Sequence, residues 1–455
     1  MNPAGVAAFL RQDYTAYRLY VLDDSTATDE IERVDALRRR WSGRFDVIRR
    51  ETRTGFKAGN LNHALRELGD SYKYICVVDA DEVIPADFLR RLVAVAEARD
   101  GLGFVQAAHT QYSTSRHARL TGDGIDPHWR YFLPARNRFG FVHFYGHGAL
   151  LNVKAVLSVG GFPEVVSEDI ALAARLREAG FRGYFASHVT SLEECPPSYE
   201  AFRRRSGKIL AGTLQFLFQL FPSFLRSSRV PLVEKIDVLV SASVMYLPIF
   251  YLMFVFLLHA GILCAGTDPL ARTGTQPSTG AQQSALSIRA GVDAMLGWPT
   301  VALVCLTIFA PFVYLIPNTL RNPRKVLPYC FRMGAVHLST CLATLGATYR
   351  WLTSRRNCFV PTGDRTYHRK PNGRIECVVG LSIVLMSLFV GSPCLGALGL
   401  SLMMVPCLMS SDFEFRKASV FLCVPMLLTL VALFGPSFGL VAMSGVLLGL
   451  GFVHL

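Results

Sequence analysis

Short apolar runs alternate with amphipathic segments through the first half of the chain. Runs typical of buried strands lie at 18–22, 45–48, 74–78 and from 104 onward, and segments with helical spacing lie at 31–41, 58–68, 85–98 and 168–179. In one of these segments Leu61, Ala64 and Leu65 fall on a single helical face. Because strands and helices alternate, the pattern predicts an α/β domain built on a parallel, doubly wound sheet.

Long apolar stretches dominate the chain after Val230. The segments that approach the roughly 20 residues of a membrane-spanning helix are 236–263, 298–317, 377–391, 394–410, 418–434 and 438–455. The third and fourth are short and are separated by Gly391, Ser392 and Pro393, so one kinked helix is the alternative there. The pattern predicts a transmembrane region of about six helices over 236–455.

The charges between these stretches predict their orientation. The segments 318–330 and 350–374 are basic, whereas 265–297 is balanced, so the positive-inside rule places the basic segments in the cytoplasm. The moderately apolar 331–349 and 209–226 are better interpreted as helices lying in the membrane interface. We therefore expect a cytoplasmic α/β domain over 1–208, an interfacial helix and linker over 209–235, and then the membrane region.

Composition narrows the function classes. The chain is 51% hydrophobic and carries a formal net charge of +13. Its basic residues cluster beside apolar segments, which argues against a nucleic-acid partner and for membrane lipid. The 11 Cys residues are scattered and contain no C-x-x-C, so a zinc site or disulfide framework is not expected. Met1 to Leu10 lack the apolar core of a signal peptide.

Acidic residues stand at two places where a sheet edge or a helix begins. Asp79 and Asp81 follow the apolar run 74–78, and carboxylates there suit Mg²⁺ or Mn²⁺ on a diphosphate. The alternative is that they cap the helix near Pro85. Glu168 and Asp169 open another helix, where one could deprotonate an acceptor hydroxyl or both could simply complement the helix dipole.

Other polar positions complete the candidate chemistry. Asp24 could accept hydrogen bonds from a nucleoside, and Lys57 lies between two glycines at a helix start, which suits phosphate. Gly146 and His147 belong to an aromatic segment that could line a sugar pocket, or form a buried turn. The basic run 203–208 could hold a pyrophosphate, or could contact anionic lipid.

The order of these motifs resembles the processive inverting glycosyltransferases of family 2, which include the cellulose, chitin and hyaluronan synthases. The segments 22–26 and 56–59 also look like those of plant mannan and glucan synthases. The segments 145–149 and 194–197 are similar to bacterial glucosyltransferases that make osmoregulated periplasmic glucans. The resemblance implies an α/β, GT-A-like doubly wound mixed sheet domain, followed by an all-α transmembrane bundle with interfacial helices.

The resemblance also implies roles for the candidate residues. Asp24 would contact uridine, Lys57 would lie near the nucleotide, and Asp79 would help bind UDP. Asp81 would hold Mg²⁺ or Mn²⁺ on the diphosphate, and Asp169 would be the general base. The further substrate-binding candidates are Gly146, His147, Glu168, Arg205 and Lys208. The implied reaction is one in-line displacement at the anomeric carbon, with inversion.

Two departures from the family pattern bear on this expectation. The Gln-x-x-Arg-Trp motif of the family aligns with Arg205, Lys208 and Ile209, so the aromatic platform for the acceptor sugar is replaced. The chain also begins at the helix that follows the family's first strand, so that strand and its nucleotide-gripping loop are expected to be missing. The segment 359–363 is placed like the gating loop of the synthases.

The expected protein is therefore a UDP-sugar-dependent hexosyltransferase in the bacterial inner membrane, with its catalytic domain in the cytoplasm. Its donor would be UDP-glucose, and its acceptor a growing β-linked polysaccharide, whose synthesis is expected with or without coupling to export. The alternatives are a non-processive enzyme that glycosylates a lipid-linked acceptor, and a truncated, inactive relative.

Overall fold

The computed structural model describes residues 3–69, 71–80, 82–112, 128–194, 199–244, 246, 249, 340–353, 373–390 and 393–405. The predicted spans 298–317, 418–434 and 438–455 lie outside these residues, as do Asp81 and the segment 359–363.

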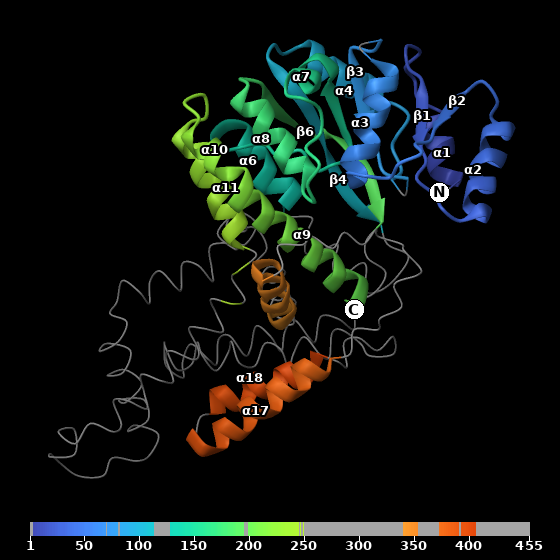
Figure 1. The fold of residues 1–455 in the computed structure, drawn as a ribbon. Coiled ribbons are helices and arrows are strands. Elements are labelled where there is room, and N and C mark those ends of the chain that lie inside the picture. The colour runs from blue at the N-terminus through green and yellow to red at the C-terminus, as the bar shows by residue number, and fades with distance from the viewer. Residues whose placement is uncertain are drawn as a thin grey trace, which may run out of the picture. The chain divides into compact units, whose positions relative to one another are not determined.

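The first half of the chain alternates strands and helices, as its apolar pattern predicts (Figure 1). The strands are β1 (Leu19–Leu22), β2 (Phe45–Ile48), β3 (Tyr74–Val77), β4 (Leu102–Tyr112), β5 (Ala149–Asn152) and β6 (Arg182–Glu194). The helices between them are α1 (Pro3–Phe9), α2 (Thr28–Arg40), α3 (Phe56–Leu68), α4 (Phe88–Glu97), the π-helical turn η1 (His128–Phe132), α6 (Leu133–Phe139), α7 (Val153–Ser158) and α8 (Glu168–Glu178).

Helices alone follow β6 in the described residues. They are α9 (Tyr199–Gln219), α10 (Phe221–Arg226), α11 (Leu232–Val244), a helix over 340–353, α17 (Arg374–Val390) and α18 (Pro393–Met403).

The strands form two sheets, and their directions are mixed. β1 and β2 pair in parallel, and a four-stranded sheet has the order β3-β5-β4-β6. β4 and β6 are parallel, but β5 runs antiparallel to both β3 and β4. The parallel pairing that the alternation of strands and helices predicts holds for β1 with β2 and for β4 with β6 but not for β5, so the sheet is mixed, as the family resemblance implies.

Both faces of the four-stranded sheet are covered. Phe104 and Leu151 lie in a core with residues of α3, α8, α9 and α10. Their neighbours Val105 and Leu150 lie in a second core with α4. Since side chains alternate across a strand, each strand contributes to both cores, which fixes the register of the sheet.

The end of α9 and helices α10 and α11 pack on the α/β domain (Figure 1). Two charged residues of α11 form ion pairs with it. Arg177 of α8 pairs with Glu234 at 2.8 Å, and Arg136 of α6 pairs with Asp237 at 3.0 Å. Five apolar residues of α11 face outward, since Leu232, Val233, Ile236, Leu239 and Val240 are 51% to 68% exposed, whereas Val238 is buried in the core. This helix therefore packs inward through its charged residues and Val238 and exposes an apolar face.

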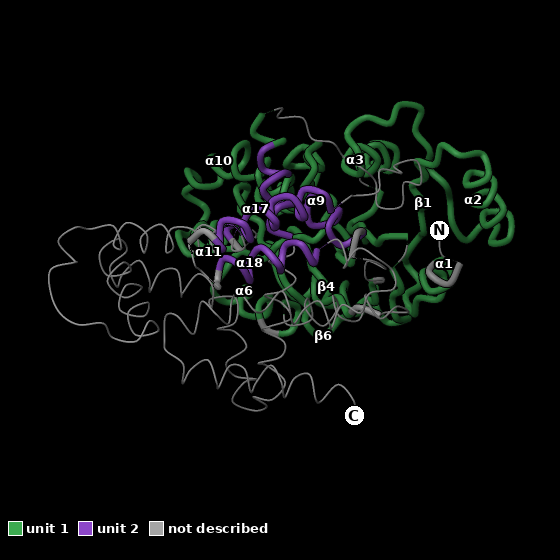
Figure 2. Tube along the Cα trace, turned by 90° about the horizontal axis from the view of Figure 1, so that it is seen from below, with its two compact units in different colours: residues 1–197, 208–242, 350–363 green, residues 198–207, 243–349, 364–455 purple. Residues whose placement is uncertain are grey.

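The chain divides into two compact units (Figure 2): 1–197, 208–242 and 350–363 form the first, and 198–207, 243–349 and 364–455 the second. In the second unit α17 and α18 form a close pair, because a Cβ on Gly380 would lie 2.6 Å from the carbonyl oxygen of Gly399. Two helices, rather than one kinked helix, therefore occupy the region of the third and fourth predicted spans. Within the described residues, no helix combines the length and apolar character needed to cross a membrane.

Candidate active site

Asp79, which follows β3, forms an ion pair with Lys57 of α3. The ammonium of Lys57 lies 2.6 Å from Asp79 Oδ1. α3 begins at Phe56 directly after Gly55, whose φ of 72° lets the chain turn sharply into the helix. The glycine-rich start of α3 thus places the lysine at the carboxyl edge of the strand, where open α/β sheets bind ligands.

This pair is held ionised by its surroundings. Burial opposes the charge on Lys57, but the carboxylates of Asp79, Glu168 and Asp169 outweigh it and raise the pKa of the lysine. Burial likewise opposes the charge on Asp79, yet Lys57, His147 and Lys208 together lower its pKa. Asp79 is therefore a carboxylate, the form that a divalent cation requires.

Gly146 lies between this pair and the second acidic cluster. Its φ is 84°, and a Cβ built on it would lie 3.7 Å from Asp169 Oδ2 and 3.9 Å from Lys57 Nζ. The positive φ favours glycine, and a Cβ at this position would be in van der Waals contact with both groups, so the turn passes close to each of them. Residues about ninety positions apart in the sequence are thus brought to one place.

Glu168 and Asp169 open α8 and share a partly buried position. Burial, then the neighbouring charge of Asp169, raises the pKa of Glu168 to about 7. Burial also raises the pKa of Asp169, although the Ile170 N–H donates to Asp169 Oδ1 at 2.8 Å. A carboxylate whose pKa is raised by burial is a stronger base than a free one, as proton abstraction requires.

α9 fixes the loop that leads into these carboxylates. The Val166 N–H donates to the buried Gln215 Oε1 at 3.0 Å. A Cβ on Gly212 would lie 1.9 Å from Ser167 Oγ, so only glycine allows the helix this close. Lys208 stands one turn before Gly212, and burial lowers its pKa despite Glu168, Asp169 and Asp79. One face of α9 therefore supports both the base and a cation beside it.

The structure separates the other positions of the basic run. Ile209 is 44% exposed, and Arg205 belongs to the second compact unit, whereas Lys208 belongs to the first. Within this basic run, Lys208 is thus the residue whose charge acts on the carboxylates of the site.

A buried hydrogen-bonded cluster lies beneath Asp79 and was not anticipated from the sequence. Glu82 accepts from the Asp79 N–H at 3.1 Å, and its other contacts are with His147 Nδ1 at 3.3 Å and His109 Nδ1 at 3.7 Å. Burial opposes the charge on His147, but Glu82 outweighs it and raises the pKa to about 9. Gln106 holds the same turn, since its Nε2 donates to the His147 carbonyl at 3.0 Å. His147 is thus a cation close to Asp79.

Two groups of side chains near β3 could supply ligand atoms to the metal ion that the family pattern implies. Asp79 is ionised, and its Oδ2 has no hydrogen bond among the described residues. Hard oxygen donors of this kind suit Mg²⁺ or Mn²⁺. Glu82, His109 and His147 also bring ligand atoms within 4.8 Å of one another. In that trio His109 already has partners, because Gln106 Nε2 lies 3.1 Å from His109 Nε2 and Ser191 Oγ lies 3.3 Å from His109 Nδ1. Glu82 Oε1, however, is buried without a hydrogen bond among the described residues.

Asp24 lies at the end of β1 in an ion pair. Its two carboxylate oxygens lie 2.9 and 2.7 Å from Nε and Nη2 of Arg50. The preceding residue, Asp23, pairs with Arg49 at 2.7 Å. The structure thus places the predicted uridine contact beside an arginine that the sequence interpretation did not consider. The adjacent Arg49 and Arg50 directly after a predicted strand were the available signal.

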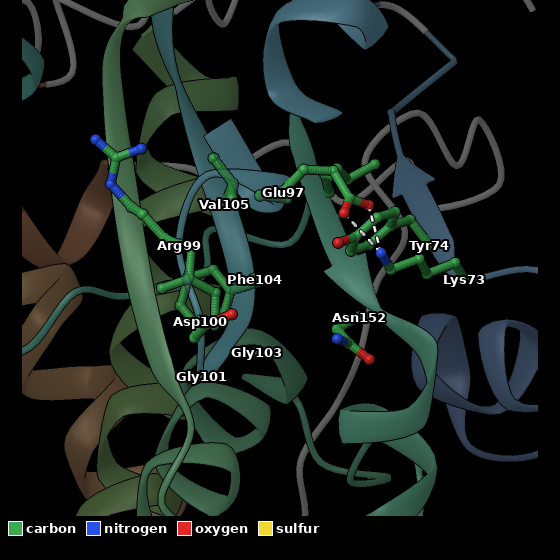
Figure 3. Close-up of a pocket in the computed structure, with 13 residues that line it drawn as sticks. Lys73, Tyr74, Glu97, Arg99, Asp100, Gly101, Gly103, Phe104, Val105 and Asn152 are labelled. Carbon is green, nitrogen blue, oxygen red and sulfur yellow. Dashed lines mark hydrogen bonds and ion pairs between the residues drawn. The ribbon is translucent and has the colours of Figure 1, made fainter. Parts of the chain in front are cut away.

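An open hollow at the amino end of β3 lies away from these residues (Figure 3). Its lining includes Lys73, Glu97 and Arg99. Lys73 Nζ lies 2.6 Å from Glu97 Oε1, and the guanidinium carbon of Arg99 lies 4.2 Å from the ring centroid of Tyr184. Lys73 and Glu97 are paired with each other and Arg99 is held against a tyrosine, so we assign this hollow no ligand.

Part of this chain is similar in sequence to known glycosyltransferases. Residues 74–269 match the sequence model of the family described as Glycosyl transferase family group 2. Glucans biosynthesis glucosyltransferase H from two strains of Rhodopseudomonas palustris is 28% and 27% identical over 222 residues, which cover 43% of this chain and 30% of each relative. The chain therefore matches less than a third of the length of these relatives.

Solved structures show a weaker likeness. The mannosyltransferase PcManGT from Pyrobaculum calidifontis, in complex with GDP-Man and Mn²⁺, has a TM-score of 0.44 and 17% identity, covering 77% of this chain and 83% of that one. Residues 1–349 of TarS from S. aureus, in complex with UDP, have a TM-score of 0.34 and 13% identity, covering 79% of this chain and 90% of that one.

The family resemblance and the α/β class predicted from the sequence are confirmed. The transmembrane bundle stays a prediction, because three of its six spans lie wholly outside the described residues. Residues 74–269, within which the β3 end and the α8 carboxylates lie, are thus similar to glycosyl transferase family group 2.

Proposed function

We propose that this protein is an inverting hexosyltransferase that uses a UDP-sugar, with UDP-glucose as its donor. The observation that carries the proposal is the arrangement around Gly146, where an added Cβ would lie 3.9 Å from Nζ of Lys57, the partner of Asp79, and 3.7 Å from Asp169 Oδ2. A donor-binding cation and a base with a raised pKa thus lie on either side of one turn. The glucosyltransferase name of the two curated relatives supports glucose as the transferred sugar.

Each residue has a role in this reaction. Asp169 takes the proton from the acceptor hydroxyl, which then attacks the anomeric carbon from the side opposite to the leaving UDP. Lys57, Lys208 and His147 offer positive charge to the diphosphate as the glycosidic bond breaks. Asp79, together with Asp81, would hold Mg²⁺ or Mn²⁺. When bound, that ion supplies charge stabilisation to the leaving diphosphate.

We further propose that the enzyme works at a membrane and extends a β-linked polysaccharide. The outward apolar face of α11 supports a lipid surface, because exposed apolar residues on a helix whose other face is ion-paired suit the bilayer interface. The long apolar segments after Val230 support an integral membrane protein with its catalytic domain in the cytoplasm. The exposed Ile209 favours a second candidate, a glycolipid-forming enzyme, because it offers no aromatic platform to a growing chain.

Metal-dependent UDP release tests this function. We expect the full-length protein in detergent to release UDP from UDP-glucose with Mg²⁺ or Mn²⁺, and to stop when a chelator removes the ion. Activity should return when the ion is restored, and should be lost in Asp81→Ala. UDP release that is unchanged both in the presence of the chelator and in Asp81→Ala would refute the metal assignment. Product length on a gel separates the candidates, since a single-sugar adduct excludes polysaccharide extension.

The pH dependence of turnover tests the pairing of the two carboxylates on α8. Since Asp169 must be ionised, kcat should rise with pH along an acid limb that lies above the ordinary range of an aspartate, because burial raises the pKa of Asp169. In Glu168→Gln the two neighbouring groups can no longer both carry a negative charge, so the pKa of Asp169 should fall and the acid limb should move to lower pH. Glu178→Gln, at the far end of α8, is the control. An unmoved limb in Glu168→Gln would show that the two groups do not interact.

A further inference from the structure

Arg50 connects two parts of the donor site. It is the second residue after β2, and its side chain is only 5% exposed. Its Nε and Nη2 donate to the two carboxylate oxygens of Asp24. Arg50 and Asp24 thus form a bidentate ion pair through one side of the guanidinium. The carboxylate itself is 33% exposed, so Asp24 is covered on its Arg50 side and open on the other.

The same guanidinium also holds the turn into α3. It donates to the carbonyl of Thr54, and through Nη2 to the carbonyl of Phe56 at 3.0 Å. Phe56 has a φ of 52°, a strained conformation that persists only where its surroundings hold it. A Cβ on Gly59 would lie 2.6 Å from Arg50 Nη1, so the glycine makes room for the arginine. Arg50 thus fixes Asp24 relative to Lys57.

The pairing restricts what Asp24 can recognise. An ionised carboxylate has about four lone-pair sites, two on each oxygen. The bidentate arginine occupies one site on each oxygen, the two that point in the same direction. The two that remain diverge, so each can accept one donor but they cannot accept two parallel donors together.

Nucleobases differ in this respect. The pairing edge of guanine presents two adjacent parallel donors, its ring N–H and its amino N–H, which suit a carboxylate with both converging sites open. Uracil presents a single ring N–H between two carbonyl oxygens, which one diverging site can accept. An Asp24 engaged by Arg50 therefore suits uracil and excludes the two-bond pairing with guanine.

We propose that Arg50 is a specificity-determining residue that selects uridine over guanosine diphosphates by occupying Asp24. This inference rests on the proposed function, which supplies the UDP-sugar donor. Arg50 acts through Asp24 and is a positioning residue, so its effect should appear in the ratio of two affinities rather than in the loss of one.

Calorimetry of the full-length protein with Mn²⁺ and either UDP or GDP tests the proposal. We expect the unmodified protein to prefer UDP. In Arg50→Met, GDP should gain relative to UDP by about tenfold, because Asp24 can then accept both guanine donors. Arg50→Lys, a point charge that cannot occupy both oxygens, should shift the ratio in the same direction and provides a second variant if the methionine does not fold.

Two controls make the outcome specific. Arg49→Met removes the neighbouring pair with Asp23 and should leave the ratio unchanged. Adding Asp24→Asn to either Arg50 variant should abolish the gain for GDP. An unchanged ratio in folded Arg50 variants, or a gain that survives Asp24→Asn, overturns the inference. If the unmodified protein binds no UDP, it is the proposed function that fails instead.

Discussion

Replacing Asp169 by asparagine should lower kcat by roughly 10²- to 10⁴-fold, the usual contribution of a positioned general base. The amide keeps the shape of the side chain and can still accept from the Ile170 N–H, which lies 2.8 Å from Asp169 Oδ1. It cannot take a proton from an acceptor hydroxyl. Since Asp169 is assigned to the acceptor and not to the nucleotide, the affinity for UDP should change little.

The measurement is UDP release under saturating donor, together with calorimetric titration of UDP. Asp46→Asn is a matched control, because Asp46 is a carboxylate of the same domain whose partner is the exposed Arg18. It should leave both quantities unchanged. If Asp169→Asn retained full turnover, Glu168 would become the candidate base. If it lost UDP binding instead, Asp169 would belong to the donor site.

The elements that carry this chemistry could be predicted because their signals are local. Tyr74–Val77 is an apolar run followed by acidic residues, and α3 and α8 each have an amphipathic pattern with glycine next to one end. Gly55 precedes α3 with a φ of 72°, and Gly180 follows α8 with a φ of 101°. Such short-range features identify where strands and helices start and stop without any knowledge of the tertiary structure.

The contacts between elements could not be predicted in the same way. Arg50 finds Asp24 because β1 and β2 pair in parallel register, which places their carboxyl ends side by side. Glu82 meets His147 because β5 follows the Gly146 turn and runs antiparallel to β3. Both contacts depend on strand order, which periodicity does not encode. Asp24 was therefore proposed from the sequence without its partner, and Glu82 was missed.

The predicted interfacial segment is another case in which the helix could be predicted from the sequence but its contacts could not. The segment 209–226 was expected to lie in the interface as a helix, and it contains the end of α9 and all of α10. Phe216 and Phe224, however, are buried in the core of the α/β domain, and Phe218 is 61% exposed. Apolarity in the sequence thus has two causes here, since one face packs on the protein and another is exposed, and composition alone does not separate them.

Replacing Lys57 by methionine should lower kcat/KM for the donor by roughly 10²- to 10³-fold, the loss expected for a partly buried, charge-assisted contact with phosphate. Methionine keeps most of the side-chain volume but removes the ammonium that lies 2.6 Å from Asp79. Three carboxylates lose a cation at once, because Lys57 acts on Asp79, Glu168 and Asp169. Donor binding should weaken, since their combined negative charge then repels the diphosphate.

The pH profile distinguishes this electrostatic role from a purely structural one. Lys57 lowers the pKa values of Glu168 and Asp169, so its loss should raise both, and the acid limb of kcat should move to higher pH. Lys57→Arg, which keeps the charge, should restore the position of the limb and part of kcat/KM. Lys73→Met removes an exposed ion pair with Glu97 in the same domain and should change neither quantity. A Lys57→Met enzyme with lower activity but an unmoved acid limb would mean that the lysine supports the fold of the turn without charging the site.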